Sequence, residues 1–350
     1  MLCAMLLTAC GAVSEAEEAI DQIGTVSLES QGKIEAAEAL YNALSDSQRK
    51  RVENRFALST ARKEYDRMFH AVETARRAIL AIGEVTPDSL DGLQKARDAY
   101  EVLKADNLTD YIPEEYNLLL MAEAEYAQLR YEEGCALLED KLYGDAHRVF
   151  SSILEDYPGC AIAASLAEGD TQALCALAQQ QLWAGKLEDA YYALREITEN
   201  YGSSDSVEAL QTQLQQRLDA KRPYNGQVFT NTAGWGYGEF SVKADHQDAC
   251  IKLESRDDPT KYILFYARAG QEAKVNVKDG RYIAKYATGD QWFDQNVLFG
   301  KDTAYTRAED VMDLTTTYEG GYVYYQAISI TLYSVIGGDL ETSDIPASQF

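Results

Sequence analysis

The amino-acid sequence predicts a multi-domain protein in which an all-α helical repeat region precedes an all-β antiparallel sandwich. Three observations lead to this fold class. The residue alphabet changes at Arg222-Pro223, from Ala, Glu, Leu, Gln and Arg at helical spacing to short Val, Ile, Tyr, Phe and Thr runs punctuated by Gly and Asp. The N-terminal part repeats itself. The length of 350 residues also exceeds one ordinary core, which favours several domains.

The composition limits what the protein binds. Hydrophobic residues make up 46% of the chain and aromatic residues 10%, which is enough for packed cores. The 57 Asp and Glu residues outnumber the 32 Lys and Arg residues and give a formal net charge of −25. Nucleic acids and anionic lipid surfaces are bound chiefly through Lys and Arg, so this charge argues against both partners. We interpret the acidic excess as a solvated surface.

Residues 1–10 predict an export signal. A short apolar run, Leu2 to Leu7, leads into Leu7-Thr8-Ala9-Cys10-Gly11. This segment resembles a bacterial lipobox, in which small residues precede a cysteine that is lipidated after cleavage. The resemblance implies a lipid on Cys10 and an extracytoplasmic location, anchored to the bacterial cell membrane through that lipid only. A complete signal begins with a positive segment, which is missing before Cys10. We therefore expect a signal truncated at its start, and a chance match is the alternative.

Residues 11–126 predict a pair of three-helix repeats. Gly24 and Gly83, in equivalent positions, are placed to end a helix as left-handed C′ residues. Ser27 and Thr86 follow as expected N-caps, and Ser45–Gln48 has the form of a capping box. The nine positions that recur 59 residues on are Ile20, Ile23, Gly24, Val26, Ser27, Ile34, Ala37, Tyr41 and Leu44. The unit resembles spacer repeats of Gram-positive surface proteins, which implies a spacer or protein-contact role.

Residues 127–222 have a different helical pattern. Gly134, Ala146, Phe150 and Pro158 have the spacing of a tetratricopeptide repeat, and a weaker second copy follows. The segment therefore resembles tetratricopeptide proteins, with a 44-residue step between Ala146 and Ala190 where the family has roughly 34. We expect an inserted loop or short helix at residues 159–170. Residues 207–220 are expected to form a helix that caps the repeats.

The tetratricopeptide resemblance implies a concave face that binds a peptide. Carried over by position, that face includes Tyr131, Gln179 and Trp183. The alternative is a plain helical spacer in which Trp183 packs between repeats, because solenoids normally need more than two repeats to form a groove.

Residues 223–350 predict the β-sandwich. Lys274–Lys278 and Arg281–Tyr286 alternate apolar and polar residues around Asp279-Gly280, which predicts a hairpin with a two-residue turn. The eight expected strands are Gln227–Asn231, Glu239–Ala244, Ala249–Glu254, Lys261–Arg268, Glu272–Val277, Arg281–Ala287, Val311–Thr317 and Ala327–Val335. The hairpin resembles those of prealbumin-like and other bacterial surface modules, which supports the fold rather than a function.

Aromatic residues supply the candidate binding positions of this β region. Trp235 and Tyr237 lie in one Gly-containing loop, and Trp292 lies in another. Exposed, such rings would stack on a carbohydrate. The alternative is ordinary packing in the core or between sheets.

No catalytic motif and no cofactor or metal-binding spacing is present in the sequence. The nearest approach to a cation site is the cluster Asp245-His246-x-Asp248. The sequence therefore predicts a non-catalytic cell-surface lipoprotein that binds or scaffolds a protein or peptide. The alternative is a carbohydrate-processing or hydrolytic accessory protein whose β module binds glycan.

Overall fold

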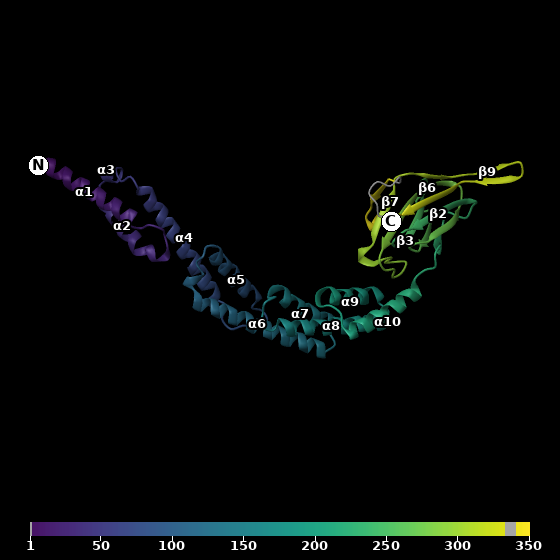
Figure 1. The fold of residues 1–350 in the computed structure, drawn as a ribbon, viewed down its shortest axis with the longest axis horizontal. Coiled ribbons are helices and arrows are strands. Elements are labelled where there is room, and N and C mark those ends of the chain that lie inside the picture. The colour runs from purple at the N-terminus through teal and green to yellow at the C-terminus, as the bar shows by residue number, and fades with distance from the viewer. Residues whose placement is uncertain (1, 333–340) are drawn as a thin grey trace. The chain divides into compact units, whose positions relative to one another are not determined.

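The computed structural model describes residues 2–332 and 341–350, with side chains described from residue 11 onward. The predicted order is confirmed, because a helical part over residues 11–221 is followed by a mostly antiparallel β-sheet part over residues 228–344 (Figure 1). The chain divides into two compact units, Met1–Asp170 and Thr171–Phe350. The change of residue alphabet at 222–223 corresponds to the change from helix to strand, which lies inside the second unit. No helix within the described residues is both long and apolar enough to cross a membrane.

The first unit contains the repeated three-helix pattern. Gly24 and Gly83 both adopt left-handed backbone, with φ of 62° and 64°, as the repeat predicts for helix ends. The helices are α1 (Leu2–Asp21), α2 (Gln31–Ala43), α3 (Asp46–Arg49), α4 (Arg55–Leu80), α5 (Leu90–Ala105), α6 (Pro113–Glu139) and α7 (Tyr143–Asp156). Cys10 lies in α1, among the residues whose side chains are not described.

Helix α4 belongs to both repeats. Leu58 and Tyr65, in its first half, pack in one core with α1 and α2. Met68 and Ile79, in its second half, pack in the next core with α5 and α6. The expectation that a helix continues from one repeat into the next is therefore confirmed.

The predicted cap Ser27 begins the 3-10 turn η1 (Leu28–Ser30), which leads into α2, while the α-helices α2 and α5 themselves begin three residues later than predicted. Ser30 and Ser89 occupy the N-cap positions, and their hydroxyl oxygens accept the backbone N–H of Ser27 and Thr86 at 3.0 and 2.9 Å. In both repeats an extra turn precedes the α-helix, so the helix starts later in the chain than predicted. The capping box at Ser45–Gln48 is confirmed, since the backbone N–H of Ser45 donates to Oε1 of Gln48 at 3.0 Å.

Helices α6 and α7 approach closely through small residues. Gly134 lies against the ring of Phe150, and a methyl group at that position would overlap the ring. Ala146 and Phe150 are fully buried. The sequence pattern Gly134–Ala146–Phe150 thus marks a tight helix crossing.

The second unit begins within α8 (Ala163–Ala184) and continues with α9 (Leu187–Tyr201) and α10 (Asp205–Lys221). Helix α10 covers the expected capping helix at 207–220. The expected insertion at 159–170 is a short turn followed by the first residues of α8. The core of this helical part also receives Phe293, which comes from a loop of the β region.

The β region forms a large and a small sheet packed face to face, with Phe240 and Val275 of the small sheet sharing one core with Ile251 and Phe265 of the large sheet. The large sheet has the order β1-β4-β3-β6-β7-β12 with β8 beside β6, and the small sheet has the order β11-β2-β5, in which β11 and β2 are parallel. The strands are β1 (Val228–Asn231), β2 (Gly238–Ala244), β3 (Asp248–Ser255), β4 (Tyr262–Ala267), β5 (Glu272–Val277), β6 (Gly280–Gly289), β7 (Ala304–Ala308), β8 (Met312–Leu314), β9 (Thr316–Glu319), β10 (Tyr322–Tyr325), β11 (Ala327–Leu332) and β12 (Thr342–Asp344). The predicted sandwich is confirmed.

The predicted hairpin at Asp279-Gly280 is wrong. Strand β5 pairs with β2, whereas β6 pairs with β3, β7 and β8, so the chain passes from one sheet to the other at residues 278–279. Both strands alternate because each presents one face to the shared core, and this pattern does not report which strand is the hydrogen-bonded neighbour. Asp279 instead accepts hydrogen bonds from the N–H and Oγ1 of Thr316, at 2.9 and 2.6 Å.

Candidate binding sites in the second unit

The hairpin β9–β10 projects from the sandwich (Figure 1). It carries a dense group of exposed tyrosines. We call residues 316–325 the aromatic ribbon. Its turn is Gly320-Gly321, with φ of 59° and 84°, the positive values that a tight hairpin turn requires. At its base Asp279 holds Thr316. Local turn chemistry and one carboxylate thus position the ribbon.

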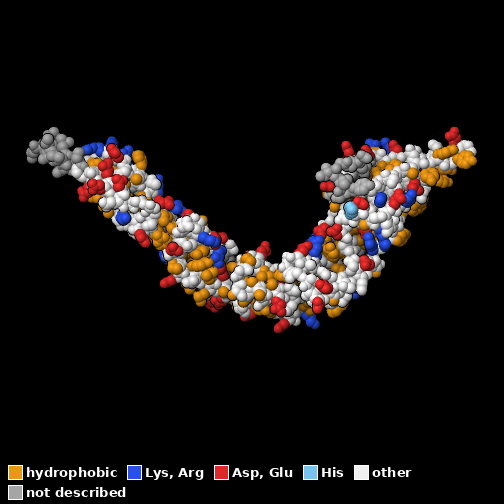
Figure 2. All heavy atoms as spheres, in the orientation of Figure 1, with side chains coloured by type: hydrophobic (Ala, Val, Ile, Leu, Met, Phe, Trp, Pro, Cys, Tyr) orange, Lys and Arg blue, Asp and Glu red, His pale blue; other side chains and the backbone are white. Residues whose placement is uncertain are grey.

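The tyrosines occupy both faces of the aromatic ribbon. Tyr318 lies opposite Val323, and Tyr325 lies opposite Thr316, so these side chains share one face. Tyr322 and Tyr324 lie on the other face because successive residues of a strand alternate. The exposed fractions of the four tyrosines range from 51% to 70%. Figure 2 shows apolar side chains gathered on this projecting hairpin.

The loop of Trp235 and Tyr237 lies beside one face of the ribbon. The rings of Tyr237 and Tyr318 meet edge to face, with centroids 6.4 Å apart and planes at 83°. Gly236 contacts the backbone of Val277 and Lys278 so closely that a side chain at this position would overlap it. Trp235 and Tyr237, on either side of Gly236, are both exposed. The structure therefore adds these predicted residues to the aromatic surface.

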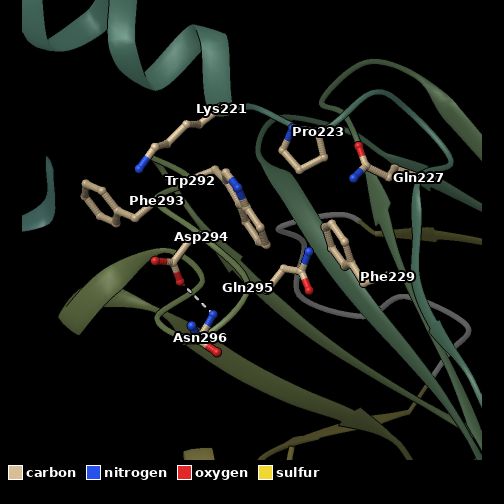
Figure 3. Close-up of a pocket in the computed structure, with 9 residues that line it drawn as sticks. All are labelled: Lys221, Pro223, Gln227, Phe229, Trp292, Phe293, Asp294, Gln295 and Asn296. Atoms are coloured by element: carbon tan, nitrogen blue, oxygen red, sulfur yellow. Dashed lines mark hydrogen bonds between the residues drawn. The ribbon is translucent and has the colours of Figure 1, made fainter. Parts of the chain in front are cut away.

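The predicted residue Trp292 lies elsewhere, at the edge of a polar pocket of about 360 Å³ (Figure 3). We call it the amide pocket. It is lined by Lys221, Pro223, Gln227, Phe229, Trp292, Phe293, Asp294, Gln295 and Asn296. These residues come from the end of α10, from the start of β1 and from the loop at 290–303. The sequence prediction missed all of them except Trp292.

Trp292 is only 3% exposed and supports the pocket from below. Its ring stacks on Phe229, with centroids 5.5 Å apart and planes at 6°. The edges of Tyr266 and Phe299 hold it from other sides, at 4.9 and 5.5 Å. The packing alternative is therefore the one observed for Trp292, and Phe229, which is half-buried, is the ring nearer the solvent.

No model of a known protein family matches this chain. A search of curated proteins also finds no similar sequence. The functional argument therefore rests on the surfaces of the protein itself.

The helical candidates lie apart from these surfaces in the chain. Trp183 is 76% exposed, so the alternative in which it packs between repeats is wrong. Gln179, one turn earlier on α8, is half-buried. Tyr131 belongs to the first unit and is also half-buried, with its ring 5.8 Å from that of Phe150. A hydrogen bond with Cys135 raises the pKa of Tyr131. Tyr131 is therefore partly a packing residue, and Trp183 is a free aromatic surface.

The cluster Asp245-His246-x-Asp248 is divided, since His246 pairs with Asp245 while Asp248 lies at the junction between helix and sheet. Asp248 accepts a bidentate hydrogen bond from Arg222, at 2.7 and 2.6 Å, together with the N–H of Ala269 and the hydroxyl of Tyr266. Burial opposes ionisation of Asp248, but these donors outweigh burial and hold its pKa below the usual value. Among the side chains that the structure describes, in residues 11–332 and 341–350, no three of His, Cys, Asp or Glu are arranged to hold a metal ion.

Proposed function

We propose that this chain is a non-catalytic binding or scaffolding protein of the bacterial cell surface, anchored through a lipid on Cys10. In this proposal the three-helix and tetratricopeptide-like repeats act as spacer and contact platform. The β-sandwich acts as the binding module. The observation that carries the proposal is the aromatic ribbon with its neighbouring loop, where Trp235, Tyr237 and four ribbon tyrosines are all exposed, since clustered exposed apolar side chains often mark interaction sites.

The distribution of tyrosines favours a protein partner for the ribbon. Exposed rings on both faces can be buried together only by a partner that encloses the hairpin, as a cleft between two protein surfaces does. The perpendicular rings of Tyr237 and Tyr318 do not form the flat platform on which a linear polysaccharide would stack. Tyrosine is also a typical interface residue, because it provides a large contact area with few rotatable bonds.

An acidic side chain at the tip of the ribbon supports one further feature of that partner. Glu319 lies beside Gly320, opposite Tyr322. A cleft that is apolar inside and basic at its rim would complement this hairpin and speed its encounter.

Replacement of the ribbon tyrosines by serine tests the proposal. We expect the combined variant, with Tyr318, Tyr322, Tyr324 and Tyr325 changed to Ser, to lose the partner that the wild-type protein retains in a pull-down. Truncation of a hot-spot side chain typically costs at least about 2 kcal/mol of binding free energy. Tyr224→Ser is the matched control, because Tyr224 is also exposed but lies outside the ribbon. If both variants retained the partner equally well, the ribbon would not be part of the binding site.

A further inference from the structure

The amide pocket has the features of a preformed site. Trp292 is fixed by three aromatic neighbours, and Phe293 anchors the same loop in the core of α9 and α10. Oδ1 of Asp294 accepts the N–H groups of Asn296 and Val297, at 2.7 and 3.1 Å, which closes a turn. Leu298, just after this turn, holds a left-handed backbone with φ of 52°. The loop is thus held in one conformation before any ligand binds.

Several polar groups of this pocket are free to bind. The side chains of Lys221, Gln295 and Asn296 and the Oδ2 atom of Asp294 form no hydrogen bond with any described residue. The side-chain Oε1 of Gln227 accepts the backbone N–H of Tyr224 at 3.2 Å, which leaves the side-chain NH₂ group of Gln227 as a donor. Figure 3 shows these groups arranged around the rings of Trp292 and Phe229. The pocket therefore offers donors, an acceptor and two amides that do both.

The charges of the residues that line the amide pocket limit the class of ligand that it can bind. Lys221 and Asp294 carry opposite charges, so neither an anion nor a cation is favoured by the pocket as a whole. Phosphate would meet the carboxylate of Asp294, and a metal ion would find a single carboxylate among the lining residues. Hydroxyl groups both donate and accept, as the side chains of Gln295 and Asn296 do. The half-buried ring of Phe229 adds an apolar surface, on which the C–H face of a sugar ring can lie.

We propose that the amide pocket binds a neutral saccharide. The volume of about 360 Å³ lies at the small end of the range for small-molecule sites, which fits one sugar ring. Phe229 contacts the apolar face of that ring. Gln227, Asp294, Gln295, Asn296 and Lys221 bind its hydroxyl groups. This site shares no residue with the aromatic ribbon, so its test and that of the proposed function succeed or fail independently.

Tryptophan fluorescence offers a direct assay, because the chain contains 3 tryptophans. Trp183 and Trp235 are exposed and can be changed to phenylalanine, which leaves Trp292 beneath the pocket as the only reporter. Glucose, galactose, mannose and N-acetylglucosamine are then titrated into the millimolar range, with inorganic phosphate as the anionic comparison. Saturation-transfer NMR on the wild-type protein provides a second readout that does not depend on tryptophan.

We expect saturable binding of at least one of these sugars and none of phosphate. The double variant Gln295→Ala/Asn296→Ala should weaken that binding roughly thirtyfold, since it removes two side chains whose hydrogen bonds are worth about 1 kcal/mol each. Asn276→Ala is the control, because it removes an exposed amide on β5, outside the pocket. Absence of a sugar signal in both assays would overturn the proposal. Phosphate binding, or unchanged sugar affinity in the double variant, would also overturn it.

Discussion

At the scale of single residues, the exposed fraction of each side chain distinguishes aromatic residues on the surface from buried ones. Composition alone could not make this distinction. Trp183 and Trp235 lie on the surface, whereas Trp292 lies beneath Phe229. The sequence supplied the residue types and the loops that carry them. It could not supply burial, because Trp292 is covered by Phe229 of β1 and Tyr266 of β4, which lie far from it in the chain.

Replacement of Trp183 by alanine should leave stability nearly unchanged. The side chain is 76% exposed, so its removal creates no cavity, and surface changes typically stay within about 0.5 kcal/mol. A urea melt compares the variant with the wild-type protein. A loss of several kcal/mol, of the size that buried aromatic residues cause, would show that Trp183 packs against another part of the chain.

Asp248 should make stability depend on pH in the acid range. Its folded pKa lies below the ordinary value, so ionised Asp248 stabilises the fold above the ordinary Asp pKa of about 3.9. This contribution is lost as the pH falls through the folded pKa. We expect Asp248→Asn to be less stable than the wild-type protein at neutral pH, and the difference to shrink below about pH 4.

Urea melts of both proteins across this pH range measure the effect. Arg222→Ala should lower stability at neutral pH by about 3 kcal/mol, because it leaves the buried carboxylate without its main partner. A stability difference that stays constant with pH would show that ionised Asp248 does not hold the junction.

At the scale of elements, the sequence predicts local structure well and strand pairing poorly. Gly24 and Gly83 end helices, and Ser45–Gln48 caps one, because each of these signals acts over a few residues. The pairing of β5 with β2 instead joins strands that lie far apart in the chain. The Gly320-Gly321 turn is a local hairpin signal in the sequence, and attention to it could have revealed the ribbon.

The loop at 290–303 also links helix and sheet within the second unit, in addition to the Arg222–Asp248 pair. Phe293 is buried among α9 and α10 and lies edge to face with Tyr191, with centroids 5.5 Å apart. We expect Phe293→Ala to cost about 3–5 kcal/mol, because it leaves a cavity in the helical core. It should also uncouple the melting of the helices from that of the sheets.

Far-UV circular dichroism and Trp292 fluorescence, in the Trp183→Phe/Trp235→Phe background, follow the two transitions separately. We expect the two transitions to coincide when Phe293 is present and to separate in the Phe293→Ala variant. Separate transitions already present before Phe293 is changed would show that the loop does not join the two parts.

At the scale of the whole molecule, the order of helical repeats followed by a β-sandwich follows from the change of alphabet near residue 222. The amide pocket could not be predicted, because Lys221, Gln227 and Asn296 meet only through tertiary packing. The aromatic ribbon exposes four tyrosines whose rings core packing within the described residues does not bury. The central claim is that a partner protein encloses it.

Site-specific photo-crosslinking from each face of the ribbon tests that claim most directly. A benzoylphenylalanine is placed at Tyr318 in one variant and at Tyr322 in another, because these positions lie on opposite faces. Tyr224, which is equally open to solvent but outside the ribbon, carries the same group in the control. The account predicts that both ribbon variants crosslink to one and the same protein and that the control does not. Crosslinking from a single face, or from neither, would contradict it.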